Sequence, residues 1–120
     1  MTETNGLVGR DAFLLPARRR FREIAIEGFG AVRLRSLTER ELAEIESHAV
    51  TSKGTLDPHR LKAARRMLIA ASVVDADGNR ILSDQDAEQL GDMDGQVADQ
   101  IHDAARELCG ASAIDAKKKS

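Results

Sequence analysis

Residues 22–46 read REIAIEGFGAVRLRSLTERELAEIE, and this stretch decides the fold of the N-terminal half of the chain. Apolar and polar side chains alternate in EIAIE and again in AVRLR, so the two isoleucines share a face with Val32 and Leu34. The letters GFG between the two runs supply glycines, which tolerate a positive φ. The pattern predicts a β-hairpin with a short glycine loop, whose arginines point away from the apolar face.

Two longer helices are predicted directly after the hairpin. Thr38 followed three residues later by Glu41 has the spacing of a capping box, so a helix is expected to begin there. After the polar loop TSKGT, Asp57-Pro58 offers an N-cap followed by proline at the first helical position. Each helix then carries one apolar stripe. The stripe residues are Leu42, Ile45 and Ala49 in the first helix and Leu61, Ala64, Leu68 and Ala71 in the second.

Two further helices are predicted in the C-terminal half. Ser83 with Asp86 gives another capping pattern, for a short helix that reaches about Leu90. A longer helix then ends at Gly110, where a glycine can adopt the left-handed conformation that closes a helix. The apolar stripe of this helix consists of Met93, Val97, Ile101, Ala105 and Leu108.

Length and composition indicate one globular domain. The chain has 120 residues, 42% of them hydrophobic and 32% charged, and only 2% aromatic, so its core has to be built from aliphatic side chains. We therefore predict a mainly α (α+β) fold, a small helical domain of about four helices with an N-terminal β-hairpin. The predicted organisation is a flexible N-terminal arm over residues 1–12, a single domain over 13–110 and a flexible tail over 111–120.

Composition also bounds the cellular setting. The single cysteine, Cys109, cannot form an intramolecular disulfide, which fits a reducing cytoplasm. The N-terminus lacks the pattern of a signal peptide, and no apolar run approaches the ~18 residues needed to span a bilayer. A net charge of −2 gives no general argument for binding nucleic acid or anionic lipid. We expect a soluble intracellular protein.

The segment DADGNRILSDQD, residues 75–86, resembles a calcium loop at first sight. With Asp75 at the first ligand position, Arg80 occupies the position that requires glycine, and Gly78 comes two residues early. Moving the frame to correct this makes Val73 the first ligand, and its side chain has no oxygen. The segment is better interpreted as an Asp-Gly turn between two extended pieces, followed by a helix cap.

No pattern in the sequence predicts catalysis, a cofactor or a metal. His48, His59 and His102 are widely spaced and match no zinc-binding pattern, so we expect them to be solvated or packed. Cys109 falls in the last turn of a helix, where the dipole disfavours a thiolate, so it is interpreted as a packing residue. The chain contains no P-loop, nucleophile elbow or dinucleotide fingerprint.

One basic run leaves an alternative open. ARRRFR at residues 17–22, together with Arg65-Arg66, could serve a small nucleic-acid-binding regulator. The run is a single cluster in a net-acidic chain and its one interleaved aromatic is Phe21, so a solvated hairpin edge is favoured. A site for an acidic protein partner also competes.

The order of these motifs resembles the tail assembly chaperones of long-tailed bacteriophages and prophages. That family has an extended N-terminal segment with an R-x-L-T-x-x-E start to its first helix, an aliphatic run before a D-x-x-G turn, an acidic S/T-D-x-D-x-x-x-L helix and a terminal amphipathic helix. The likeness spans roughly residues 13–110. The matching residues are Leu37, Thr38 and Glu41 at the helix start and Val73, Val74, Asp75, Gly78, Ser83, Asp84, Asp86 and Leu90 in the centre.

The resemblance implies a non-enzymatic morphogenesis factor without cofactor. Such chaperones bind the long helical tape measure protein in the host cytoplasm and hold it soluble while tail tube subunits assemble around it. They are absent from the mature virion. We therefore expect self-association or multivalent coating rather than one tight site. A structural tail or head-completion protein that stays in the particle is a further alternative.

Three residues are candidates for partner binding. Phe29 lies at the expected hairpin tip, and Arg65 and Arg66 lie on the flank of a predicted helix. An exposed loop and a solvated helix face explain the same residues without a partner.

The resemblance also draws attention to Lys117-Lys118-Lys119. In this family a longer product often arises by a programmed −1 ribosomal frameshift near the end of the short form. Consecutive lysine codons can form an A-rich slippery stretch, although an ordinary solubilising tail explains the same residues.

Overall fold

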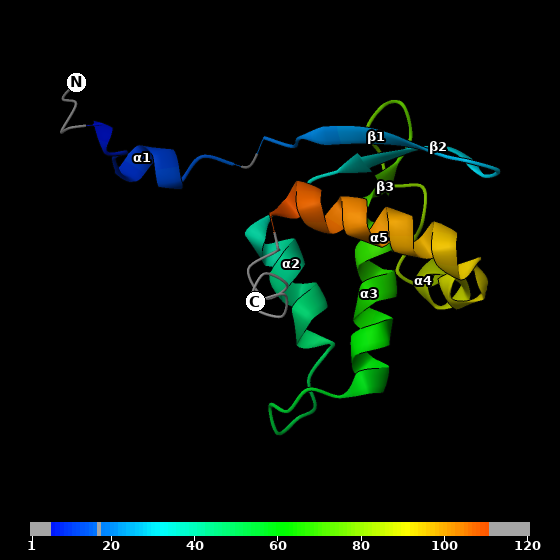
Figure 1. Ribbon diagram of the computed structural model, residues 1–120. Coiled ribbons are helices and arrows are strands. Elements are labelled where there is room, and N and C mark those ends of the chain that lie inside the picture. Colours follow the sequence, from blue (N-terminus) through cyan, green and yellow to red (C-terminus); the bar gives the residue numbers. More distant parts are fainter. Residues whose placement is uncertain (1–5, 17, 111–120) are drawn as a thin grey trace.

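The computed structural model describes residues 6–16 and 18–110 of the chain. The predicted fold, a mainly helical α+β domain with an N-terminal hairpin, is confirmed (Figure 1). The elements in chain order are α1 (Arg10–Phe13), β1 (Phe21–Ile26), β2 (Gly30–Arg35), α2 (Glu39–Ser47), α3 (Pro58–Ser72), β3 (Val73–Val74), α4 (Asp86–Gln89), the 3-10 helix η2 (Leu90–Asp92) and α5 (Gly95–Cys109).

The three strands form one antiparallel sheet in the order β1-β2-β3. The predicted hairpin is present, with Ile26 paired to Gly30 across a three-residue loop, and both Gly28 (φ 81°) and Gly30 (φ 132°) adopt a positive φ. The third strand is the first of the two extended pieces expected around the Asp-Gly turn, but its pairing with the hairpin was not predicted. It continues directly from the end of α3 and pairs with β2, placing Val74 opposite Arg33.

The core lies between the inner face of the sheet and the helices. Leu34, on the central strand, is fully buried, and α5 crosses beneath β1 and β2 while α3 rises toward β3 (Figure 1). The expected aliphatic core is observed, since all three phenylalanines are exposed. The buried residues that form the core cluster are Ile26, Val32, Leu34, Ile45, Ala49, Ala64, Leu68, Ile69, Ala71, Val73, Ile101, Ala104 and Ala105.

The predicted helix ends are largely confirmed. Thr38 and Glu41 form both bonds of the capping box, and the Asp57 side chain accepts from a backbone N–H in the first turn of α3. Gly110, with φ 71°, closes α5 in the left-handed conformation. The predicted stripe of α5 began at position 93, whereas the helix starts after Asp94, whose carboxylate accepts two backbone N–H groups. A carboxylate at this position also complements the positive end of the helix dipole.

Residues 75–86 form the expected turn followed by a cap. The Asp75 carboxylate accepts from the backbone N–H groups of Asp77 (2.9 Å) and Asn79 (3.0 Å), as in an Asx-turn. Ser83 and Asp86 exchange two hydrogen bonds of 2.8 and 3.1 Å at the turn that leads into α4. Within the described residues, no group of three or more histidine, cysteine or acidic side chains is arranged to hold a metal ion.

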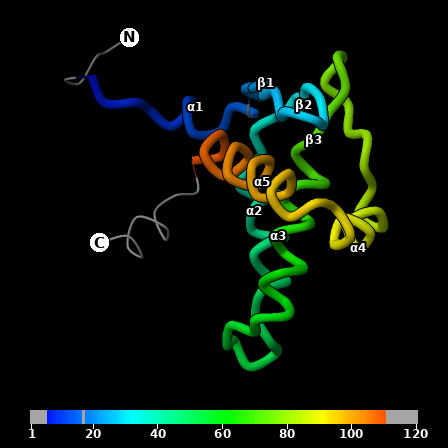
Figure 2. The backbone as a smooth tube through the Cα atoms, turned by 45° about the vertical axis from the view of Figure 1, so that its right-hand side comes forward, coloured from blue at the N-terminus to red at the C-terminus, as the bar shows by residue number. Residues whose placement is uncertain are grey.

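The N-terminal part of the described chain, residues 6–16, is called the leading segment below. Every one of its residues is exposed, including the four of α1. Figures 1 and 2 both show it running away from the body of the molecule. No helix in the described ranges is long and apolar enough to cross a membrane. Residues 1–5, 17 and 111–120 lie outside the described residues, as does the run at Lys117-Lys118-Lys119, and the predicted domain boundaries remain predictions.

Candidate partner-binding groove

A groove of about 630 Å³ opens between α2, α3 and α5. Its size lies within the ~300–1,000 Å³ that is usual for binding clefts. Apolar side chains make up most of its walls. The lining residues are Leu42, Ile45, Glu46 and Ala49 from α2 and the turn after it, Val50 and Leu56 from the following loop, Leu61, Ala64, Arg65 and Leu68 from α3, and His102, Asp103 and Arg106 from α5.

The two main walls are built by the same helical pattern. The α3 wall has residues at relative positions 0, 3, 4 and 7, which lie on one face of a helix. The α2 wall has positions 0, 3 and 4 of the same pattern, and Ala49 follows in the turn after the helix. On α3 the face runs from Leu61 to Leu68, and on α2 it starts at Leu42. The predicted apolar stripes of α2 and α3 therefore serve both the core and the groove. Part of each stripe is buried, and part lines the groove.

Burial changes along the groove from floor to rim. Ile45, Ala64 and Leu68 are buried and belong to the core cluster. At the rim, Leu61 is 42% exposed and Leu56 is 69% exposed. Leu56 is held there because the loop between α2 and α3 closes on itself through an isolated β-bridge to Val50. The arrangement offers leucine side chains to a partner without disturbing the core.

Charged groups of both signs border the apolar floor. Arg65 on α3 pairs with Asp99 on α5 at 3.1 Å. Within α5, Arg106 pairs with Asp103 at 3.1 Å. Glu46 adds an acidic group from α2. An apolar floor bordered by charged groups of both signs is the surface pattern typical of protein-binding sites.

Only two of the three predicted partner-binding residues come together. Arg65 lines the groove and also, with Arg66, a smaller pocket of about 210 Å³. The Arg66 guanidinium lies there over Gly91 and 3.9 Å from Glu88. Phe29 is 56% exposed in the hairpin loop and lines neither opening.

Three arginines of the basic run, Arg19, Arg20 and Arg22, make contacts within the chain. Arg19 binds Glu41 through two hydrogen bonds of 2.6 and 3.0 Å, and Arg22 pairs with Glu107 at 2.8 Å. Arg20 donates from its guanidinium to the carbonyl of Leu108. These arginines fasten the start of β1 to α2 and α5, which argues against a basic patch reserved for nucleic acid.

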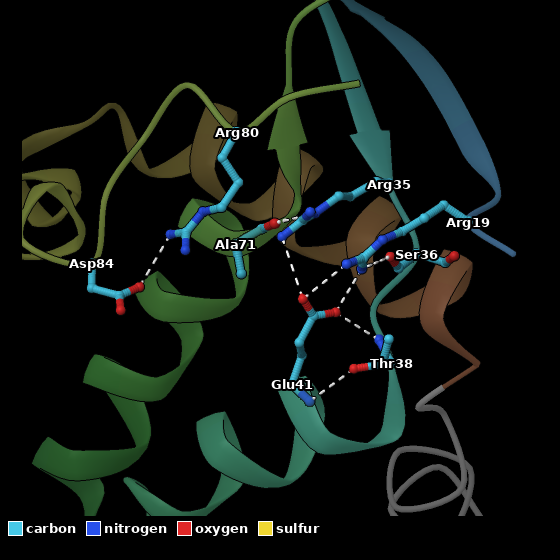
Figure 3. A network of polar contacts seen from close by, with 8 residues as sticks. All are labelled: Arg19, Arg35, Ser36, Thr38, Glu41, Ala71, Arg80 and Asp84. Atoms are coloured by element: carbon cyan, nitrogen blue, oxygen red, sulfur yellow. Dashed lines mark hydrogen bonds and ion pairs between the residues drawn. The ribbon is translucent and has the colours of Figure 1, made fainter. Parts of the chain in front are cut away.

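Glu41 is the centre of this fastening (Figure 3). Its carboxylate accepts from Arg19 and from the backbone N–H of Thr38, and it lies 3.6 Å from Arg35. The hydrogen bonds from Arg19 are the main reason why the pKa of Glu41 falls from 4.5 to about 2, against the opposing effect of burial. Burial and the nearby Arg19 lower the pKa of Arg35, even though Glu41 raises it.

The other titratable candidates fit their structural interpretation. Cys109 is half-buried against the core at the end of α5, and burial raises the pKa of its thiol. His48 is exposed and lies 3.7 Å from Glu44, and His59 is exposed. His102 is buried in the wall of the groove.

The groove is not predicted from the sequence. The predicted apolar stripe of α3 includes Leu61, and Leu56 lies between the predicted loop TSKGT and the predicted N-cap at Asp57. A usable signal was present, because Leu56 is the one large apolar residue in TSKGTLDP and because the stripe of α3 begins a full turn before its first buried residue.

The structure is a small α+β domain, with two helices splayed below a sheet and a third helix crossing beneath it. The same fold is found in the tail assembly chaperone of bacteriophage HK97, with a TM-score of 0.60 and 20% sequence identity over 75% of this chain and 85% of that chain. The resemblance inferred from the sequence is therefore confirmed at the level of the fold. No protein-family model matches the chain. The comparison with curated proteins gives no match either.

Proposed function

We propose that the protein is a phage tail assembly chaperone that binds the tape measure protein non-covalently, with the groove between α2, α3 and α5 as its binding site. The observation that carries the proposal is the pair of helix faces with open leucines at their rim, in a chain that shares the fold of the HK97 chaperone. The proposed role is non-enzymatic and needs no cofactor. It places the protein in the host bacterial cytoplasm and not in the mature virion.

A helix is the occupant that best fits the groove. Side chains at positions 0, 3 and 4 on both walls, with position 7 on α3, accept the matching ridge of an amphipathic helix laid between them. Full burial of a leucine contributes about 1.5–3 kcal/mol, whereas association costs about 4–15 kcal/mol, so one such contact is weak. Many copies bound along one long helical client are strong together. Weak individual contacts also allow displacement when the tail tube protein assembles.

The test is co-expression with the tape measure protein and measurement of the soluble fraction of that client. Leu61→Asp and Leu56→Asp place a charge at the rim of the groove without entering the core, so they should remove most of the solubilising effect. Ile81→Asp is the matched control, because Ile81 is exposed and lines neither opening. Circular dichroism verifies that each variant is folded.

Two results would count against the proposal. If the wild-type protein leaves the client as insoluble as when the client is made alone, the chaperone role is wrong. If Leu61→Asp and Ile81→Asp behave alike, the role stands but the groove is not its site. Mass spectrometry of purified virions separates a chaperone from a structural tail or head-completion protein, which remains in the particle.

The remaining candidate residues belong to secondary proposals. Arg65 borders the groove and is proposed to contact acidic groups of the client. Phe29 and Arg66 lie on other surfaces, so they are proposed as contacts to a second partner such as the tail tube protein. A salt-dependent mobility shift with DNA would instead favour the nucleic-acid alternative.

A further inference from the structure

Strand β1 lies at the edge of the sheet with one side open. The strand order is β1-β2-β3, so within the described residues β1 pairs with β2 alone (Figure 1). Four of its six residues are exposed. An open strand edge offers a row of backbone N–H and C=O groups on which another extended chain can pair.

The hydrogen bonds at the start of the hairpin show which backbone groups of β1 are free. Arg20 and Ser36 continue the register of β1 and β2 by one pair, and the Ser36 N–H donates to the Arg20 carbonyl at 2.8 Å. In an antiparallel pair, residues whose backbone groups face the partner strand alternate with residues whose groups face away. The residues whose groups point out of the open edge are therefore Phe21, Glu23 and Ala25.

The side chains of β1 give each face of this edge a different chemistry. Arg22, half-buried Ile24 and buried Ile26 share the inner face of the sheet, because side chains alternate along a strand. Glu23 lies on the outer face, 3.2 Å from Arg33. An added strand therefore meets a cation and two isoleucines on one face and an anion on the other.

These charges do not suit pairing of β1 with the same strand of a second copy. Two antiparallel registers give the largest overlap of β1 with itself. One places Glu23 directly opposite its own counterpart, and like charges in this position destabilise a strand pair. The other places Arg22 opposite Ile26, so the guanidinium gains no anion. Neither register joins opposite charges, so the edge fits a strand of different sequence.

We propose that β1 binds an extended segment of a protein partner as an added antiparallel strand. The segment that fits has an anion opposite Arg22, a cation opposite Glu23 and apolar residues opposite Ile24 and Ile26. Because the two strands run in opposite directions, its sequence reads apolar, any residue, apolar, basic, acidic. Backbone hydrogen bonds supply affinity, and the side chains supply selectivity. No residue of β1 lines the groove or the smaller pocket, so this surface is separate from the proposed client site.

The first test is an NMR titration of the ¹⁵N-labelled full chain with a synthetic peptide capped at both ends, Val-Thr-Val-Lys-Glu-Val. The control peptide, Val-Thr-Val-Glu-Lys-Val, has the same composition but places like charges opposite Arg22 and Glu23. The first peptide should bind at least about fivefold more tightly, because opposite charges across a strand pair stabilise it and like charges destabilise it. Equal affinities, or no binding at millimolar peptide, would overturn the proposal.

Amide hydrogen exchange locates the bound peptide. In the free chain the amides of Glu23 and Ala25 should exchange rapidly, whereas the amide of Ile24 should be protected by β2. The first peptide should slow exchange at Glu23 and Ala25. Protection of these two amides before any peptide is added would mean that a second copy or another part of the chain already covers the edge, and the proposal would be wrong. Protection that appears only elsewhere would also contradict it.

Substitution of Ala25 tests the backbone contact directly. Ala25→Pro removes one outward N–H, and proline is tolerated in an edge strand where its missing N–H would face solvent. It should weaken binding of the first peptide by about tenfold, because a hydrogen bond is lost and the ring obstructs the edge. Ala25→Val is the matched control, since it keeps the N–H and should bind like the wild type. Equal binding by both variants would contradict the proposed contact.

Exchange of the two charges keeps the test decisive if proline disturbs the fold. Arg22→Glu combined with Glu23→Arg should reverse the preference between the two peptides, and circular dichroism verifies that the variant is folded. A preference that stays unchanged would show that the charges of β1 do not select the segment. Leu61→Asp in the groove should bind the first peptide like the wild type, so this proposal and the proposed client site fail separately.

Discussion

Two buried serines, Ser36 and Ser72, differ in whether the side-chain hydroxyl has a hydrogen-bond partner. The Ser36 hydroxyl accepts a hydrogen bond from the backbone N–H of Arg20, where the chain enters the sheet. Ser72 is completely buried in the last turn of α3, and among the described residues its hydroxyl has no hydrogen-bond partner. Burying the unpaired Ser72 hydroxyl costs free energy of folding. Removing the Ser36 hydroxyl would instead leave the N–H of Arg20 without an acceptor.

The same substitution should therefore have opposite effects at the two positions. Ser72→Ala removes the unpaired hydroxyl and favours the helix, so the free energy of unfolding should rise by about 1 kcal/mol. Ser36→Ala leaves the Arg20 N–H without its acceptor and should lower the free energy of unfolding by about 1–2 kcal/mol. Urea denaturation of both variants and the wild type measures the difference. Equal effects of the same sign would contradict this account.

At the scale of elements, the decisive junction is the one between the sheet and α2. Glu41 belongs to the first turn of α2 and binds both the backbone of Thr38 and the side chain of Arg19, which precedes β1. One carboxylate therefore caps a helix and ties the start of a strand to it (Figure 3). The stability of this junction depends on the negative charge of Glu41.

Replacing Glu41 by Gln should expose that dependence. The amide can keep the capping hydrogen bond but not the charge, so the free energy of unfolding should fall by on the order of 1–2 kcal/mol at pH 7, since solvent screens a pair that is partly exposed. The folded pKa of about 2 lies below the unfolded value of 4.5. The contribution is therefore complete above pH 4.5 and is lost as the pH falls through about 2.

Thermal unfolding at several pH values between 7 and 2 measures this effect. The wild-type protein should lose stability over the acidic part of the range more steeply than Glu41→Gln. Glu39→Gln is the control, because Glu39 is an exposed residue in the same helical turn. A Glu41→Gln variant with the same acid profile as the wild type would show that the charge does not hold the junction.

Elements set by local chemistry could be predicted from the sequence, and elements set by distant partners could not. The hairpin follows from strict alternation around glycines, and the start of α2 follows from the Thr38 and Glu41 spacing. In contrast, β3 is only two residues long and exists because the edge of β2 is available beside the end of α3. The groove depends on how far α2 and α3 diverge, and the apolar stripe that includes Leu61 does not reveal that distance.

At the scale of the whole molecule, the body and the leading segment are energetically separate. The core consists of the sheet, α2, α3 and α5, and none of the residues 6–16 contributes to it. Apolar side chains that remain exposed add little to the free energy of folding. The segment is therefore not needed for the stability of the body.

Deletion of residues 1–16 should leave the thermal unfolding midpoint within a degree or two of the full chain at low protein concentration, because surface changes outside the core have effects within about 0.5 kcal/mol. Calorimetry at low protein concentration measures this effect. A large drop in the midpoint would mean that the leading segment packs on its own body.

The positions of the phenylalanines give the molecule three natural reporters. The chain has no tryptophan or tyrosine, and its three rings stand on three separate surfaces: Phe13 in the leading segment, Phe21 beneath Arg33 on the outer side of the sheet, and Phe29 in the hairpin loop. Biosynthetic incorporation of fluorophenylalanine would give a ¹⁹F NMR spectrum of three resonances without any engineered probe. A shift confined to the Phe13 resonance would report a contact at the leading segment, while a shift confined to the Phe29 resonance would report a contact at the hairpin loop.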